Sequence, residues 1–149
     1  MPEFLHDSLL LKKHGFMTGK AKILIVEDET SVAMMMAYVL NHAGCEVQVA
    51  WNAEKAMRLA QDGDFDLITL DIDLPGTSGF EICSRLKQNS CLRDIPVIFV
   101  SGRPHEEDRR HAFELGAVDF IIKPFEVTDL IFRIISHAKR SGSVFETAC

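Results

Sequence analysis

The sequence lacks long apolar runs and has no excess of basic residues. Its longest apolar stretch is residues 32–40, whereas a membrane-spanning helix needs about 20 such residues. Acidic residues outnumber basic ones by 22 to 16, which gives a net charge of −6. Affinity for nucleic acids comes largely from basic side chains that neutralise phosphates. The sequence therefore predicts a protein that neither spans a membrane nor binds nucleic acid directly.

Cysteine is scarce, and its spacing matches no common metal site. The four cysteines stand at positions 45, 83, 91 and 149, with no C-x-x-C pair and no H-x-x-x-H motif, so a zinc site is not expected. Residues 1–20 also lack the basic end and the apolar core of a secretory signal peptide. We therefore expect four free thiols in a reducing cytoplasm.

The length of 149 residues suits a single domain, because domains commonly have about 100–200 residues. A change of pattern near residue 21 separates this domain, residues 21–140, from the stretch before it. We expect residues 1–20 to be a leader or a cloning-derived segment that is partly disordered, and residues 141–149 to be a frayed tail. The sequence ends soon after the last expected helix, so no output domain is expected within it.

Within residues 21–140, short apolar segments alternate five times with segments whose apolar residues recur at helical spacing. The expected strands are residues 23–26, 46–50, 66–70, 95–100 and 118–122. The expected helices begin near residues 30, 53, 78, 104 and 126. Strands that are apolar throughout indicate a parallel sheet covered by helices on both faces, and hence an α/β fold. The methionines at 34–36 are expected in its core.

Charged and hydroxyl side chains follow four of the five expected strands. Glu27 and Asp28 follow the first, Asp71 the third, Ser101 the fourth and Lys123 the fifth. In open α/β sheets, ligands bind outside the carboxyl ends of the strands, so these side chains are expected to meet. Crowded carboxylates favour a hard cation such as Mg²⁺, and a lysine with a hydroxyl favours a phosphoryl group. The sequence predicts a magnesium-dependent phosphoryl site.

The motifs at these strand ends resemble those of a response regulator receiver domain of two-component signalling, over residues 22–140. They are IVEDE at 25–29, LDIDLPGTSG at 70–79, VSG at 100–102 and DFIIKPF at 119–125. The resemblance implies a flavodoxin-like, doubly wound (βα)5 sandwich with strand order 2-1-3-4-5. It also implies a signalling domain that is not an enzyme beyond its own phosphotransfer and autodephosphorylation.

The resemblance also implies residue roles. Asp71 would accept the phosphoryl group from a phosphohistidine. Asp28, Asp71 and the backbone carbonyl of Asp73 would bind Mg²⁺, with Glu27 acting through water or at longer reach. Lys123 would pair with the phosphoryl oxygens. Three features depart from the usual pattern: Glu27 stands where aspartate is commoner, the switch residue at position 120 is phenylalanine and not tyrosine, and Asp73 adds an acid whose effect on the phosphoryl lifetime is left open.

A second set of implied roles concerns the switch. Ser101 would hydrogen-bond the phosphoryl group, and Phe120 would be the aromatic residue that turns inward; Ser101 can equally be a helix cap. The peptide bond before Pro124 is expected to be cis. The output face would comprise the helix at 104–115, the strand at 118–122 and the helix from 126. Apolar residues in excess of one buried stripe on the last helix favour a partner or homodimer there.

The implied partners are a sensor histidine kinase or a histidine phosphotransfer protein, and a downstream output protein or domain. The sequence leaves open whether the chain is a stand-alone receiver or part of a longer regulator or hybrid kinase. Two alternatives are a haloacid-dehalogenase-like phosphohydrolase, from the D-x-D spacing of Asp71 and Asp73, and a pseudo-receiver that only binds proteins. The position of Asp71 on the third strand argues against the first, and the intact set of site residues argues against the second.

Overall fold

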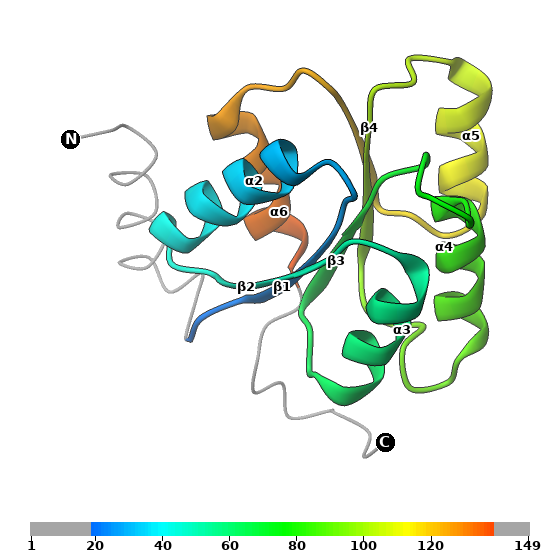
Figure 1. Cartoon of the computed structure of the whole chain (residues 1–149), viewed down its shortest axis with the longest axis horizontal. Coiled ribbons are helices and arrows are strands. Elements are labelled where there is room, and N and C mark those ends of the chain that lie inside the picture. The colour runs from blue at the N-terminus through cyan, green and yellow to red at the C-terminus, as the bar shows by residue number, and fades with distance from the viewer. Residues whose placement is uncertain (1–18, 139–149) are drawn as a thin grey trace.

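The computed structural model describes residues 19–138, which form a five-stranded parallel sheet between two layers of helices (Figure 1). The order β2-β1-β3-β4-β5 confirms the predicted flavodoxin-like topology. The expected leader at 1–20 lies almost wholly outside the described residues, and the tail at 141–149 lies entirely outside them. The strands are β1 Lys22–Val26, β2 Glu46–Ala50, β3 Leu67–Leu70, β4 Val97–Ser101 and β5 Asp119–Ile122.

Five helices cover the two faces of the sheet. They are α2 Thr30–His42, α3 Ala53–Asp62, α4 Gly79–Gln88, α5 Glu106–Glu114 and α6 Val127–His137. The helices α2 and α6 pack on one face, and α3, α4 and α5 pack on the other (Figure 1). Along β1, Ile23 and Ile25 face α2 and α6, while Leu24 and Val26 face α3, α4 and α5. Both faces of the strand are buried, which explains why it is apolar from Ile23 to Val26.

Local sequence signals fix several helix ends. Asn52 caps α3 by accepting a hydrogen bond from the backbone N–H of Lys55 at 2.8 Å, and Ser78 caps α4 through the N–H of Phe80 at 3.1 Å. Gly44, just after α2, has a φ of 96°, a left-handed conformation that favours glycine. Among residues 19–138, no helix is long and apolar enough to cross a membrane.

Gly79, the first residue of α4, lies directly against the loop that follows β3. A Cβ at this position would overlap the backbone carbonyl of Asp71, and it would also crowd the Cα of Ile72. The N–H of Gly79 donates to the carbonyl of Ile72 at 2.8 Å, so the helix start and the loop are fixed together. Only a residue without a side chain allows this approach.

Gly79→Ala is therefore expected to lower the free energy of unfolding by about 2–4 kcal/mol, because backbone must move to relieve the overlap. The measurement is urea unfolding of the wild type and the variant. Gly102→Ala is the matched control, since a Cβ there would meet no atom within 4 Å. Equal stability of the Gly79 and Gly102 variants would show that the loop yields easily.

Two predictions, one about the core methionines and one about the thiols, need correction. Met36 is buried, but Met34 and Met35 are 57% and 38% exposed, because three consecutive residues cannot all lie on the one face of α2 that meets the sheet. Cys45 and Cys83 are buried, and neither belongs to a disulfide, as expected. Cys91 is disulfide-bonded, so the expectation of a free thiol is wrong at that position.

Candidate phosphoryl and metal site

Three carboxylates meet at the carboxyl ends of β1 and β3. Ligand oxygens of Glu27, Asp28 and Asp71 lie within 4.8 Å of one another. They meet because β1 and β3 are adjacent, with Val26 opposite Leu70, so the residues that follow these two are neighbours. Glu27 and Asp71 are buried and Asp28 is exposed. The trio suits a hard divalent cation, which would face water on the side of Asp28.

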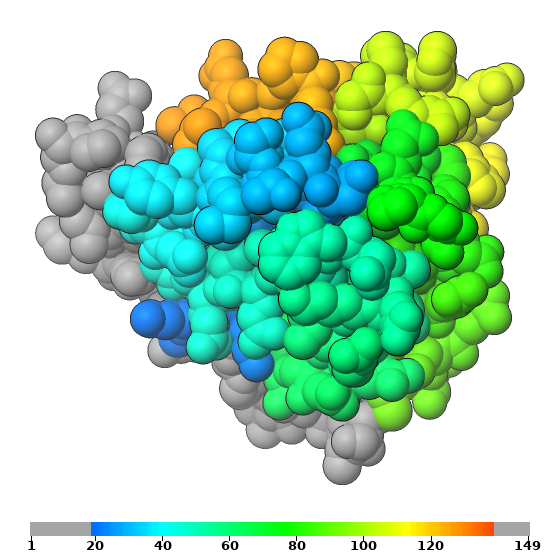
Figure 2. Space-filling model, viewed as in Figure 1, coloured from blue at the N-terminus to red at the C-terminus, as the bar shows by residue number. Residues whose placement is uncertain are grey.

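Lys123 reaches this acidic group from the loop after β5. Its Nζ donates to Asp71 Oδ2 at 3.0 Å and to Glu27 Oε1 at 2.5 Å. Its backbone N–H donates to the carbonyl of Ser101 at 2.8 Å, which fixes the loop beside β4. The bond from Lys123 to Pro124 is cis, as predicted. The segments that follow β1, β3 and β5 (blue, green and orange) adjoin one another at one edge of the molecule in Figure 2.

Burial and ion pairing act in opposite directions on the pKa values of Glu27 and Lys123. Burial raises the pKa of Glu27, and hydrogen bonds from Lys123 and from the Glu29 N–H only partly oppose it; the charge of Asp71 adds to the rise. Burial alone would lower the pKa of Lys123, but its hydrogen bonds to Glu27 and Asp71 outweigh burial and raise it. The ammonium thus stays charged and holds two carboxylates that would otherwise repel each other.

Ser101 ends β4 and is fully buried. Its Oγ accepts a hydrogen bond from the N–H of Arg103 at 3.2 Å, whereas the N-cap of α5 is His105. The alternative role of Ser101 as the cap of the following helix is therefore wrong. Phe120 lies inward, only 2% exposed, with its ring stacked on Phe99 at a centroid distance of 6.3 Å.

Asp73 is joined to the acceptor carboxylate through its backbone and to Arg103 through its side chain. The Asp73 N–H donates to Asp71 Oδ1 at 3.3 Å, and Arg103 Nη1 donates to Asp73 Oδ1 at 3.1 Å. Arg103 also binds Asp108 in the first turn of α5. Sequence reasoning missed Arg103 and Asp108, because an arginine in a loop and an acid in a helix turn carry no signal that the fold will join them.

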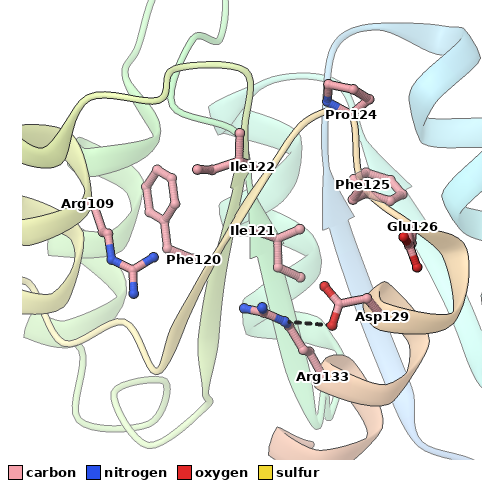
Figure 3. Close-up of a pocket in the computed structure, with 9 residues that line it drawn as sticks. All are labelled: Arg109, Phe120, Ile121, Ile122, Pro124, Phe125, Glu126, Asp129 and Arg133. Atoms are coloured by element: carbon pink, nitrogen blue, oxygen red, sulfur yellow. Dashed lines mark hydrogen bonds and ion pairs between the residues drawn. The ribbon is translucent and has the colours of Figure 1, made fainter.

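A second feature is a cavity of about 540 Å³ between α5, β5 and α6. Figure 3 shows Phe120 and Arg109 on its α5 side, and Asp129 bonded to Arg133 on its α6 side. Arg133 also donates to Asp119 at 2.9 Å, which ties the start of β5 to α6. The cavity lies on the predicted output face.

The predicted output face is buried in part and exposes apolar side chains from each of its elements. Of the apolar residues of α6, Leu130, Ile131 and Ile134 are buried, and Phe132 is 63% exposed. On α5, Ala112 is buried and Phe113 is exposed. Val118, directly before β5, and Ile122, at its end, are also exposed.

The fold and the site define an α/β domain with three carboxylates, a lysine and a hydroxyl at the carboxyl ends of its strands. Residues 23–135 match the family described as response regulator receiver domain. The chain is 40% identical over 126 residues to the phosphate regulon transcriptional regulatory protein PhoB of Pseudomonas aeruginosa, covering 85% of this chain and 55% of that protein. It spans about half the length of the curated relatives it matches.

Solved structures agree with this assignment. The chemotaxis protein CheY4 of Vibrio cholerae has a TM-score of 0.76 at 28% identity, with 80% of this chain and 99% of that one covered. A BeF3-activated DrrB receiver domain has a TM-score of 0.71 at 27% identity, with 79% and 97% covered. The chain belongs to the response regulator receiver domain family of two-component systems.

Proposed function

We propose that this receiver domain accepts a phosphoryl group on Asp71 from the phosphohistidine of a sensor histidine kinase or a histidine phosphotransfer protein. An Asp71 carboxylate oxygen attacks phosphorus, so an O–P bond forms while the P–N bond to the imidazole breaks. The imidazole nitrogen keeps the electron pair and takes up a proton. The observation that carries the proposal is Lys123 Nζ, 3.0 Å from Asp71 Oδ2 and placed between two buried carboxylates.

The same proposal assigns a Mg²⁺ ion to the acidic trio. Glu27, Asp28, Asp71 and the backbone carbonyl of Asp73 would hold it, and the cluster of carboxylate oxygens within 4.8 Å fits such an ion. When bound, the metal supplies positive charge to the phosphoryl oxygens. Lys123 supplies a second positive charge, and its donors are already aimed at Asp71.

The D-x-D alternative gains no support from the site. A phosphohydrolase of that type needs the second aspartate as a general acid beside the first. Here the side chain of Asp73 is 65% exposed and bonded to Arg103, 3.1 Å away. Asp71 and Lys123, by contrast, are both largely buried and in contact. The geometry therefore favours a receiver over a phosphohydrolase, because Asp73 is not placed beside Asp71 as a general acid.

We further propose that phosphorylation switches the face made by α5, β5 and α6. Ser101 is buried at the end of β4 and immediately precedes the loop that leads to α5. A hydrogen bond from its hydroxyl to a phosphoryl group on Asp71 would pull this loop inward. Phe120 borders the cavity of Figure 3, so its ring would change position together with the loop. The output is binding of a downstream protein or domain, or of a second copy of the chain.

The test is hydrogen exchange with and without phosphorylation by Mg²⁺ and acetyl phosphate, with intact mass as the measure of uptake. We expect exchange to change in α5 and around Phe120, because α5 buries only Ala112 fully and can shift at low cost. Ser101→Ala is expected to take up phosphate while losing that change. Uptake by the wild type with changes confined to α2 and α3 would place the output surface elsewhere.

A further inference from the structure

Arg103 joins two acidic side chains that belong to different parts of the site. Its Nη1 donates to Asp73 Oδ1 at 3.1 Å. Its Nε and Nη2 donate to the two carboxylate oxygens of Asp108 at 3.0 and 3.4 Å, a bidentate arrangement. Asp73 lies in the loop after β3 and Asp108 in the first turn of α5. The guanidinium of Arg103 therefore links the loop that contains Asp71 to the start of α5, the helix that we propose moves on phosphorylation.

Of the two acidic residues that Arg103 binds, Asp73 is the one in contact with Asp71. Its N–H donates to Asp71 Oδ1 at 3.3 Å, so its backbone is in contact with the reacting carboxylate. Its side chain is 65% exposed. A phosphodonor is an anion, and the carboxylate of Asp73 adds negative charge close to the carboxylate that the donor must reach. The bond to Arg103 compensates that negative charge.

Asp108 explains why Arg103 stays in place although it is itself 43% exposed. The side chain of Asp108 is only 13% exposed, and its two oxygens accept from two nitrogens of the guanidinium. The N–H of Arg103 is fixed as well, through its hydrogen bond to Ser101 Oγ at 3.2 Å. The positive charge is thus held at a defined position rather than on a free side chain.

We propose that Arg103 is a positioning residue that sets how fast Asp71 reacts with anionic phosphodonors, by neutralising Asp73. The inference rests on the proposed function, since it concerns the same reaction. With acetyl phosphate, an Asp71 oxygen forms a bond to phosphorus, the bond from phosphorus to the acetyl oxygen breaks, and acetate leaves with the electron pair. Arg103 takes no part in bond making; it alters the electrostatic potential through which the donor approaches.

The direction in which each substitution changes the rate of phosphate uptake follows from the charge that it removes. Arg103→Gln leaves Asp73 uncompensated and is expected to slow uptake from acetyl phosphate by about threefold to tenfold at low salt. Asp73→Asn leaves Arg103 uncompensated and is expected to speed uptake by a similar factor. The double variant restores the original charge and is expected to return to within about twofold of the wild type. Arg103→Lys keeps the charge and should react nearly as fast as the wild type.

The experiment measures initial rates of phosphate uptake by intact mass, with Mg²⁺ and either acetyl phosphate or phosphoramidate, at low and high salt. Arg58→Gln is the matched control, because Arg58 is an exposed arginine in an ion pair with Glu54 on α3. The effects are expected to be smaller with phosphoramidate, which carries less negative charge, and to shrink at high salt.

Failure of the role inferred for Arg103 can be distinguished from failure of the proposed function. If the wild type takes up phosphate but the double variant remains as slow as Arg103→Gln, Arg103 acts only as a structural link and the inference is wrong. The inference is also wrong if the Arg103→Gln variant takes up phosphate at the same rate as the Arg58→Gln control. If the wild type takes up no phosphate from either donor, the proposed function itself fails. Recovery of the rate on adding Asp73→Asn to Arg103→Gln supports the inference.

Discussion

Asp71→Asn is expected to abolish phosphate uptake while leaving the fold intact. The amide has nearly the shape of the carboxylate but lacks the nucleophilic charge, and Lys123 keeps its second partner, Glu27. With Mg²⁺ and acetyl phosphate, the wild type should gain one phosphoryl group in intact mass and the variant none. Asp62→Asn, at the end of α3 and away from the site, is the matched control and should behave as the wild type.

The second large effect is expected at Lys123. Lys123→Met removes the cation that holds two buried carboxylates, whose side chains are 3% and 10% exposed. Breaking such a buried pair from one side costs about 3 kcal/mol of unfolding free energy at neutral pH. It also removes the charge beside the reacting oxygen, so phosphate uptake is expected to slow by about a hundredfold.

The loss of stability should depend on pH in a defined direction. Burial already raises the pKa of Glu27 above the ordinary 4.5, and the bond from Lys123 opposes this rise. Without Lys123 the folded-state pKa rises further, so the folded protein binds a proton more tightly than the unfolded one. The variant is therefore most stable, relative to the wild type, near pH 4.5, and loses stability as the pH rises through the folded-state pKa.

Urea unfolding across this pH range provides the measurement, with Lys20→Met as the control because Lys20 is exposed. The difference in free energy of unfolding between the wild type and the Lys123 variant should shrink as the pH falls toward 4.5. The Lys20 control should have the stability of the wild type at every pH. A deficit that is the same at every pH would mean that packing of the lysine stem, and not its charge, accounts for the lost stability.

The sequence predicted which side chains would meet at the strand ends, because the fold brings those ends together regardless of detail. Once five strands are parallel and in this order, Glu27, Asp71 and Ser101 must lie along one edge, and this required only the positions at which the strands end. The buried strands are apolar on both faces, so they could be located with an error of only a few residues. The N-cap of α3 is a signal of the same local kind, because Asn52 accepts its hydrogen bond from Lys55, three residues further along the chain.

The missed features depend on side-chain directions that no local pattern specifies. Arg103 binds Asp73 across thirty positions of sequence, and nothing in the sequence selects that partner over another acid. Met34 and Met35 point outward although their neighbour Met36 is buried, because the rotation of α2 on the sheet decides which residues face it. Phe113 is exposed for the same reason on α5, where Ala112 takes the inward position.

The position of the phosphoryl group decides whether Asp71 is the acceptor. The chain is treated with Mg²⁺ and acetyl phosphate, the acyl phosphate is reduced with borohydride, and the resulting homoserine is located by peptide mass spectrometry. We predict reduction at position 71 alone, and none when Mg²⁺ is withheld. Reduction at Asp28, Asp73 or any other acid would show that Asp71 is not the acceptor, and uptake that is equal without Mg²⁺ would show that the reaction does not need the metal.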